Sequence, residues 1–114
     1  MENNKTKVGI VGLGLIGSSI LKGLFDKEDY ELFVCSKSSY NEAFEYTKNS
    51  SPDIKIVKNC DIVFVCSSVS NTLITLEELN NILDKDTIVA DVTSIKKDLL
   101  NKKFDFTFIL SHPM

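Results

Sequence analysis

Residues 7–20 read KVGIVGLGLIGSSI and decide the fold of this chain. The apolar run over residues 7–11 predicts a buried strand, and the apolar residues after it recur at helical spacing. Between them, Gly12, Gly14 and Gly17 fit the pattern G-x-G-x-x-G. The first glycine of such a turn permits a tight bend, the second lets a phosphate approach the backbone, and the third lets the helix pack against the strand. The stretch therefore predicts a strand, a phosphate-binding turn and a helix, and its alternative is a glycine-rich turn without a ligand.

The free N–H groups at the start of this helix would hold the pyrophosphate of a dinucleotide. The residues expected at this part of the site are Gly12, Leu13, Gly14, Leu15, Ile16 and Gly17.

Apolar runs and helical patterns alternate along the rest of the chain. Strands are expected at residues 7–11, 30–35, 53–57, 61–66, 87–92 and 106–110, and helices near 16–25, 40–47, 70–83 and 94–103. The helix at 70–83 has an alternative as two short helices, because Thr75 and Glu78 fit a capping box. The alternation predicts one α/β domain over residues 1–114, a Rossmann-type doubly wound parallel sheet of six strands. Right-handed crossovers favour the order 3-2-1-4-5-6 with helices on both faces.

Size, charge and cysteine use exclude several classes of protein. The 114 residues are enough for one hydrophobic core, and a net charge of −3 offers no basic face to nucleic acid. No apolar run reaches the about 20 residues of a membrane span, and the N-terminus lacks the apolar core of a signal peptide. Three cysteines without paired spacing are typical of reduced thiols in a cytoplasmic protein, so no metal site is expected.

The end of the second predicted strand indicates which dinucleotide binds. In this fold an acidic residue about 20 positions past the glycines holds the ribose 2′-hydroxyl of NAD. That place holds Ser36 and Lys37, whose hydroxyl and ammonium groups suit a 2′-phosphate. We therefore predict NADP, with NAD as the alternative, although Lys37 could also be an ordinary solvated lysine. Ser67 and Ser68, after the fourth strand, are a further candidate for phosphate contact or a plain serine-rich turn.

The chain has one histidine, His112, directly after the last predicted strand. Histidine is the usual general base near neutral pH, so His112 is a catalytic candidate beside a bound nicotinamide. By position alone, however, a single histidine at the end of a chain is more often incidental.

Three motifs in this order and spacing resemble the nucleotide-binding domain of the prephenate dehydrogenase family. Residues 8–24 are similar to the opening of that family. Residues 91–96, DVTSIK, resemble its Asp-x-x-Ser-Val-Lys motif, and residues 111–114, SHPM, resemble its His-Pro-Met/Ile-Ala-Gly motif.

The resemblance implies an NAD(P)-dependent oxidoreductase of tyrosine biosynthesis, in which prephenate is oxidatively decarboxylated to 4-hydroxyphenylpyruvate. It implies that His112 draws the proton from the ring hydroxyl of the substrate. Ser94 would hold that hydroxyl and the histidine in place, and its alternative is a helix N-cap. The substrate would be prephenate or arogenate, and the full-length protein would be a homodimer.

The chain also departs from the family. Ser36-Lys37 replaces a common Asp-Arg pair, and Val69 stands where a proline is usual. The family's C-terminal helical dimerisation domain is absent, and so are the arginines that clamp the substrate carboxylates, since the chain has no Arg. We therefore expect the cofactor half of a longer enzyme, one that binds NADP without measurable prephenate turnover.

Other functions stay open. An arogenate dehydrogenase would share the motifs of the resembled family. Another dehydrogenase of the β-hydroxyacid type would share the nucleotide-binding turn but would not need His112. A stand-alone nucleotide-sensing module fits the length, although such modules commonly keep the acidic residue that Ser36 replaces.

Overall fold

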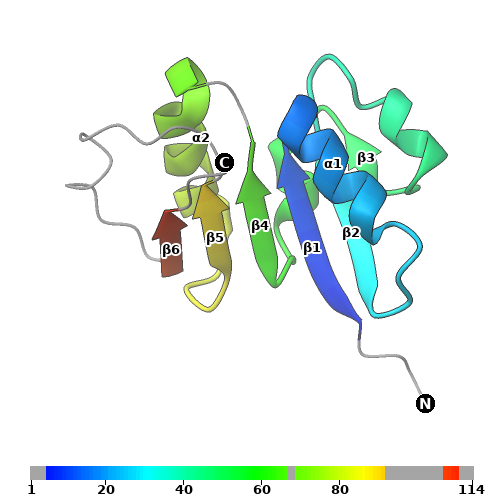
Figure 1. Ribbon diagram of the computed structural model, residues 1–114. Coiled ribbons are helices and arrows are strands. Elements are labelled where there is room, and N and C mark those ends of the chain that lie inside the picture. The colour runs from blue at the N-terminus through cyan, green and yellow to red at the C-terminus, as the bar shows by residue number, and fades with distance from the viewer. Residues whose placement is uncertain (1–4, 67–68, 92–106, 111–114) are drawn as a thin grey trace.

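Parallel strands form a single sheet in the computed structural model, which describes residues 5–66, 69–91 and 107–110 (Figure 1). Within those residues the strands are β1 Thr6–Val11, β2 Tyr30–Cys35, β3 Ser50–Ser51, β4 Ile62–Val65, β5 Ile88–Asp91 and β6 Thr107–Leu110. They are ordered β3-β2-β1-β4-β5-β6, and every neighbouring pair is parallel. The predicted doubly wound sheet and its strand order are confirmed.

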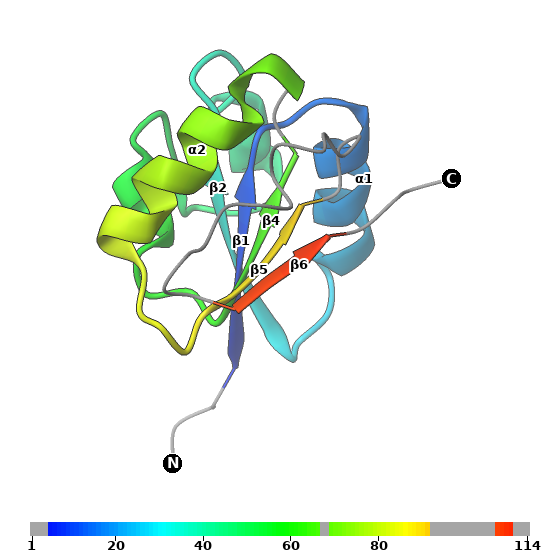
Figure 2. The ribbon, with the colours of Figure 1, turned by 90° about the vertical axis from the view of Figure 1, so that its left-hand side faces the viewer.

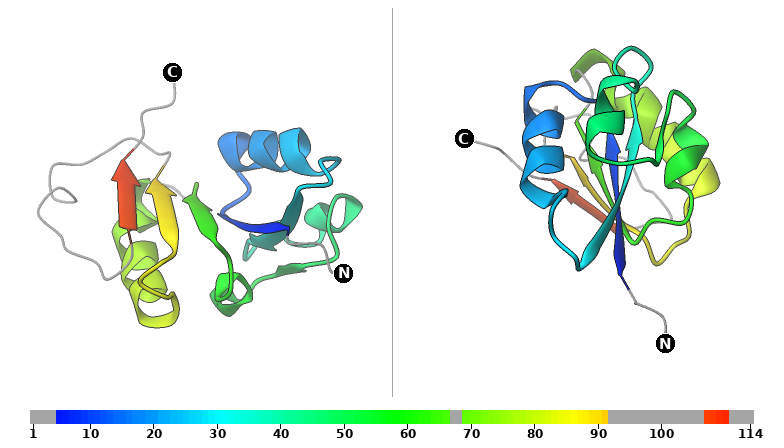
Figure 3. Two further views of the ribbon diagram at one scale, coloured as in Figure 1. Left: turned by 90° about the horizontal axis from the view of Figure 1, so that it is seen from below. Right: turned by 90° about the vertical axis from the view of Figure 1, so that its right-hand side faces the viewer.

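Helices lie on both faces of this sheet. In the part of the chain that the structure describes, the α-helices are α1 Leu15–Leu24 and α2 Val69–Ile82, and the short 3₁₀ helices are η1 Glu42–Glu45 and η2 Ile54–Val57. Seen along the sheet, α1 and α2 lie on opposite sides of it (Figure 2). The view from below also shows the sheet lying between α1 and α2 (Figure 3).

The strands alternate their side chains between two buried clusters, as the pleat of a strand requires. Val8 and Ile10 of β1 belong to the cluster under α1, and Val11 belongs to the cluster under α2 and η2. Gly9 also faces η2, because a Cβ built there would lie 2.9 Å from Cγ1 of Val57. Burial on both faces explains why the central strands are apolar without alternation.

The prediction of a strand at residues 53–57 is wrong, because Ile54–Val57 form η2 instead and Asp53 is its N-cap. The third strand is Ser50–Ser51, which pairs with the end of β2. Asp53 caps η2 by accepting a hydrogen bond of 3.0 Å from the backbone N–H of Lys55. Val57 is thereby fully buried against β1, so tertiary packing overrode the strand propensity of a short apolar run.

Two helical expectations also need correction. The helix expected at residues 40–47 is the single 3₁₀ turn η1, after which the hydroxyl of Thr47 donates to the carbonyl of Leu32 at 2.8 Å. The division of residues 70–83 into two helices is wrong, because α2 is continuous and Thr75 lies buried within it. The helix expected at 94–103 lies outside the described residues. Among the residues that are described, no helix is long and apolar enough to cross a membrane.

Candidate functional site

The glycine turn has the geometry that its sequence predicts. Gly12 adopts a φ of 98°, a conformation that favours glycine, and its N–H donates to the carbonyl of Cys35 at 2.8 Å. A Cβ on Gly17 would collide with the backbone carbonyl oxygen of Gly12. The two glycines therefore let α1 start directly against the end of β1.

The start of α1 is open to an approaching group. Gly14 is the N-cap, and no side chain caps the helix there. A Cβ on Gly14 would meet no atom within 4 Å, and the first helical residue, Leu15, is 87% exposed. An uncapped helix start carries free N–H groups and a partial positive charge, which is the ordinary way for a protein to bind phosphate.

This helix start borders a pocket of about 700 Å³ at the carboxyl ends of β1, β2 and β4. Its volume lies within the range of small-molecule and cofactor sites. The pocket brings together residues 12–14 of the glycine turn and residues 36–39 of the loop after β2. Leu15, Ile16 and Gly17 are not among its lining residues but form the first turn of α1 beside it.

The loop after β2 closes on itself through Ser36. The backbone N–H of Ser39 donates to Oγ of Ser36 at 3.0 Å, and the N–H of Ser36 donates to the carbonyl of Ser51 at 3.1 Å. Ser36 is thus buried, whereas Lys37 and Ser38 are exposed on the pocket rim. No carboxylate occurs in residues 36–39, so this loop offers hydroxyls and one ammonium group to a ligand.

One wall of the pocket was not foreseen from the sequence. It comes from Ile54 of η2 and from Ile74, Thr75 and Glu78 of α2. Among the described residues that line the pocket, Glu78 is the only carboxylate. The spacing of Ile74 and Glu78, four residues apart, indicates a shared helix face, but nothing local says that this face meets η2.

Cys35 and Cys66 also line the pocket, and the pKa of each thiol is raised. Burial raises the pKa of Cys35 to about 11. Burial, with a further contribution from the charge of Asp91, raises the pKa of Cys66 to about 12. Both thiols are therefore neutral at physiological pH and act as small apolar side chains. In the described part of the chain, no group of three or more His, Cys, Asp or Glu residues is placed so that it could hold a metal ion.

The remaining predicted site residues are Ser67, Ser68, Ser94 and His112, and all four lie outside the described residues. Asp91, which begins the motif at 91–96, is fully buried at the carboxyl end of β5. It pairs with Val65 of β4, so the first residue of the motif lies at the edge of the sheet that carries the pocket.

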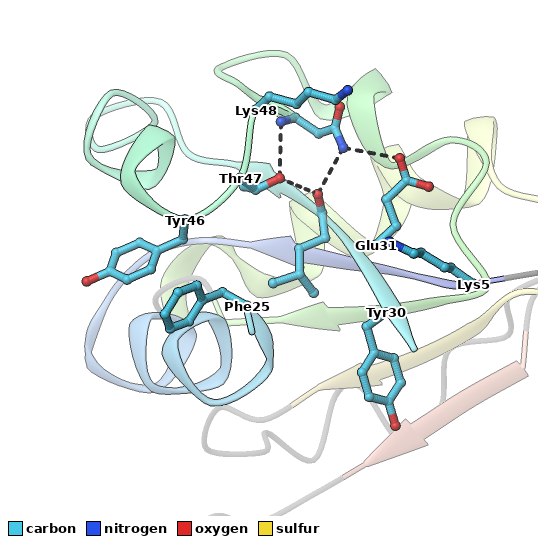
Figure 4. A pocket seen from close by; sticks show the side chains of 9 residues that line it. Lys5, Phe25, Tyr30, Glu31, Tyr46, Thr47 and Lys48 are labelled. Carbon is cyan, nitrogen blue, oxygen red and sulfur yellow. Dashed lines mark hydrogen bonds between the residues drawn. The ribbon is translucent and has the colours of Figure 1, made fainter. Parts of the chain in front are cut away.

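A second hollow of about 490 Å³ lies at the amino ends of β1 and β2 (Figure 4). Among the residues that line it, the hydroxyl of Thr47 and the side-chain amide of Asn49 both donate hydrogen bonds to the carbonyl of Leu32. Phe25 and Tyr46 pack edge to face on one side of it, with ring centroids 5.0 Å apart. This hollow is at the opposite edge of the sheet from the glycine turn and is not part of the candidate site.

Comparison with known proteins agrees with this arrangement. The model of the prephenate dehydrogenase nucleotide-binding domain matches residues 31–114, a range that begins after the glycine turn. No curated protein matches the chain.

Solved structures share the fold. Arogenate dehydrogenase from Synechocystis is 32% identical, with a TM-score of 0.73 over 84% of this chain and 36% of that one. Prephenate dehydrogenase from A. aeolicus, solved with hydroxyphenyl propionate and NAD+, is 24% identical, with a TM-score of 0.78 over 97% of this chain and 42% of that one. A putative oxidoreductase from Mycobacterium avium 104 is 16% identical, with a TM-score of 0.72 over 93% of this chain and 41% of that one.

This chain thus spans about two-fifths of the length of these solved proteins. The family model covers well over half of the chain. The chain therefore belongs to the family of prephenate dehydrogenase nucleotide-binding domains.

Proposed function

We propose that this chain binds NADP in preference to NAD and forms the cofactor half of an enzyme that oxidises prephenate or arogenate. The observation that carries the proposal is the uncapped start of α1, which opens beside Gly14 onto the pocket. We assign the backbone amides of Leu15, Ile16 and Gly17 to the pyrophosphate, because free N–H groups at a helix start bind phosphate. The complex of the A. aeolicus enzyme with NAD+ supports a dinucleotide as the ligand.

The preference for NADP rests on the loop after β2. A 2′-phosphate would meet the hydroxyl of Ser36 and the exposed ammonium group of Lys37 there. Charge-assisted contacts of this kind are stronger than neutral ones, and a carboxylate at the same place would repel the phosphate.

The bound nicotinamide supplies the hydride acceptor, and the chain supplies groups that bind and position. In our proposal His112 takes the proton of the substrate hydroxyl, Ser94 positions that hydroxyl, and Ser67 and Ser68 contact phosphate. These four assignments rest on the sequence motifs. The complete enzyme would act as a cytoplasmic homodimer in tyrosine biosynthesis.

Titration of the purified chain with each dinucleotide tests the cofactor. We expect NADP to bind more tightly than NAD in isothermal titration calorimetry, because only NADP offers a 2′-phosphate to Lys37. Binding of NAD that is tenfold tighter than that of NADP would overturn the preference, and binding of neither would overturn the proposed function.

Ser36→Asp is expected to shift the preference toward NAD by about tenfold, the size of one charge-assisted hydrogen bond. One carboxylate oxygen can keep the bond from the Ser39 N–H, and the other can accept from the ribose hydroxyls. Dissociation constants for NAD and NADP give the ratio.

Ser38→Asp is the matched control, because it adds the same charge two residues further along the loop. We expect it to weaken the binding of NADP without strengthening the binding of NAD. An unchanged ratio in Ser36→Asp would remove Ser36 from the ribose site.

A further inference from the structure

The wall of the pocket that η2 and α2 form, called the slot below, offers apolar side chains against which a flat ring can pack, and one carboxylate. Ile54 is half-buried, and Ile74 is 58% exposed although it is a large apolar side chain. Both line the pocket, and η2 and α2 pack into the same core cluster under the sheet. The slot and the loop at residues 36–39 line the same pocket, and the proposed function places the ribose of the adenosine half at that loop.

Glu78 supplies a charged hydrogen-bond acceptor at this slot. It lies four residues after Ile74, on the same face of α2, and its side chain is both exposed and part of the pocket lining. Its charge reaches the end of β2, because Glu78 contributes to raising the pKa of the Cys35 thiol, while Lys37 lowers it. Glu78 and Lys37 therefore present opposite charges to one pocket.

We propose that the carboxylate of Glu78 accepts a hydrogen bond from the exocyclic amino group of the adenine ring and so selects adenine dinucleotides. An ionised carboxylate only accepts hydrogen bonds, and the 6-amino group of adenine only donates them. A base with a 6-oxo group would instead place a second acceptor against Glu78. The inference rests on the proposed cofactor function and assigns to Glu78 the reading of the base, a role separate from that of Ser36 and Lys37 at the ribose.

The test compares NADP with nicotinamide hypoxanthine dinucleotide phosphate, which carries oxygen in place of the 6-amino group. Dissociation constants of both are measured by calorimetry for the wild-type chain and for Glu78→Gln. We expect the wild type to prefer NADP by about five- to tenfold. Glu78→Gln should reduce this preference to about twofold or less, because an amide can accept from the amino group and donate to the oxo group.

Glu77→Gln is the matched control, since it removes the same charge from the neighbouring exposed position of α2, outside the pocket lining. We expect it to keep the wild-type ratio. Glu78→Lys should reverse the preference, because an ammonium group donates to the 6-oxo group. Both positions are exposed, so thermal unfolding midpoints should stay close to that of the wild type.

Three results would overturn the inference. If Glu78→Gln strengthened the binding of both dinucleotides equally, Glu78 would act only by repelling their phosphates. If the wild type bound both dinucleotides equally well, Glu78 would not read the base, and the proposed cofactor function would stand. If the wild type bound neither dinucleotide, the proposed function itself would be wrong, and the inference would fail with it.

Discussion

Gly17→Ala is expected to abolish measurable NADP binding and to lower the free energy of unfolding by about 1–3 kcal/mol. The added methyl group would overlap the carbonyl oxygen of Gly12 and come within 3.1 Å of its carbonyl carbon. Both atoms are backbone, so relief requires α1 to move away from β1 or the turn to open, and either movement displaces the N–H groups at the helix start. Urea denaturation measures the loss of stability, and calorimetry measures the loss of binding.

Gly14→Ala separates binding from folding at the same turn. Gly14 has a φ of −74°, which alanine adopts freely, and its added Cβ would meet nothing within 4 Å. The added methyl group causes no clash, so the free energy of unfolding should fall by no more than about 1 kcal/mol, the cost of an N-cap replacement. Binding of NADP should still fall at least about tenfold, because the methyl group fills the space through which the phosphate approaches. Wild-type affinity in both variants would show that the pyrophosphate does not bind at this turn.

Leu79→Ala is expected to lower the free energy of unfolding by about 2–5 kcal/mol. Leu79 is fully buried in the cluster that joins α2 to β4, β5 and η2, so its removal leaves a cavity in the core. Small domains are stable by only about 5–15 kcal/mol, so the loss is a large fraction of the total. Urea denaturation curves with well-defined folded and unfolded baselines measure this loss of stability.

Ile74→Ala is the control on the same helix, because Ile74 is 58% exposed. We expect the free energy of unfolding to change by less than about 0.5 kcal/mol in this variant. A loss below 1 kcal/mol in Leu79→Ala, similar to that of the control, would contradict the packing of α2 on the sheet.

The sheet could be predicted from the sequence because its signals are local. The expected range of β2, residues 30–35, matches the observed Tyr30–Cys35, and the central strands β1 and β4 deviate from expectation by two residues or fewer at either end. Continuous apolar runs between helical patterns are typical of parallel strands covered on both faces, and right-handed crossovers leave few possible orders. The exception is residues 54–57, where a four-residue apolar run could be either strand or helix. The Asp53 cap and the packing of Val57 against Gly9 stabilise a 3₁₀ turn over a strand there.

The glycine turn was determined by the sequence alone, because each requirement involves residues within six positions of one another: the bend at Gly12, the open space at Gly14 and the close approach at Gly17. The opposite wall of the pocket was decided only by the tertiary structure. Ile54 belongs to the element that precedes β4 in the chain, and Glu78 belongs to the element that follows it. The local sequence of neither element indicates that the two pack together. They line one pocket because the sheet packs η2 and α2 into a common core, and this burial of apolar surface acts between residues far apart in the chain.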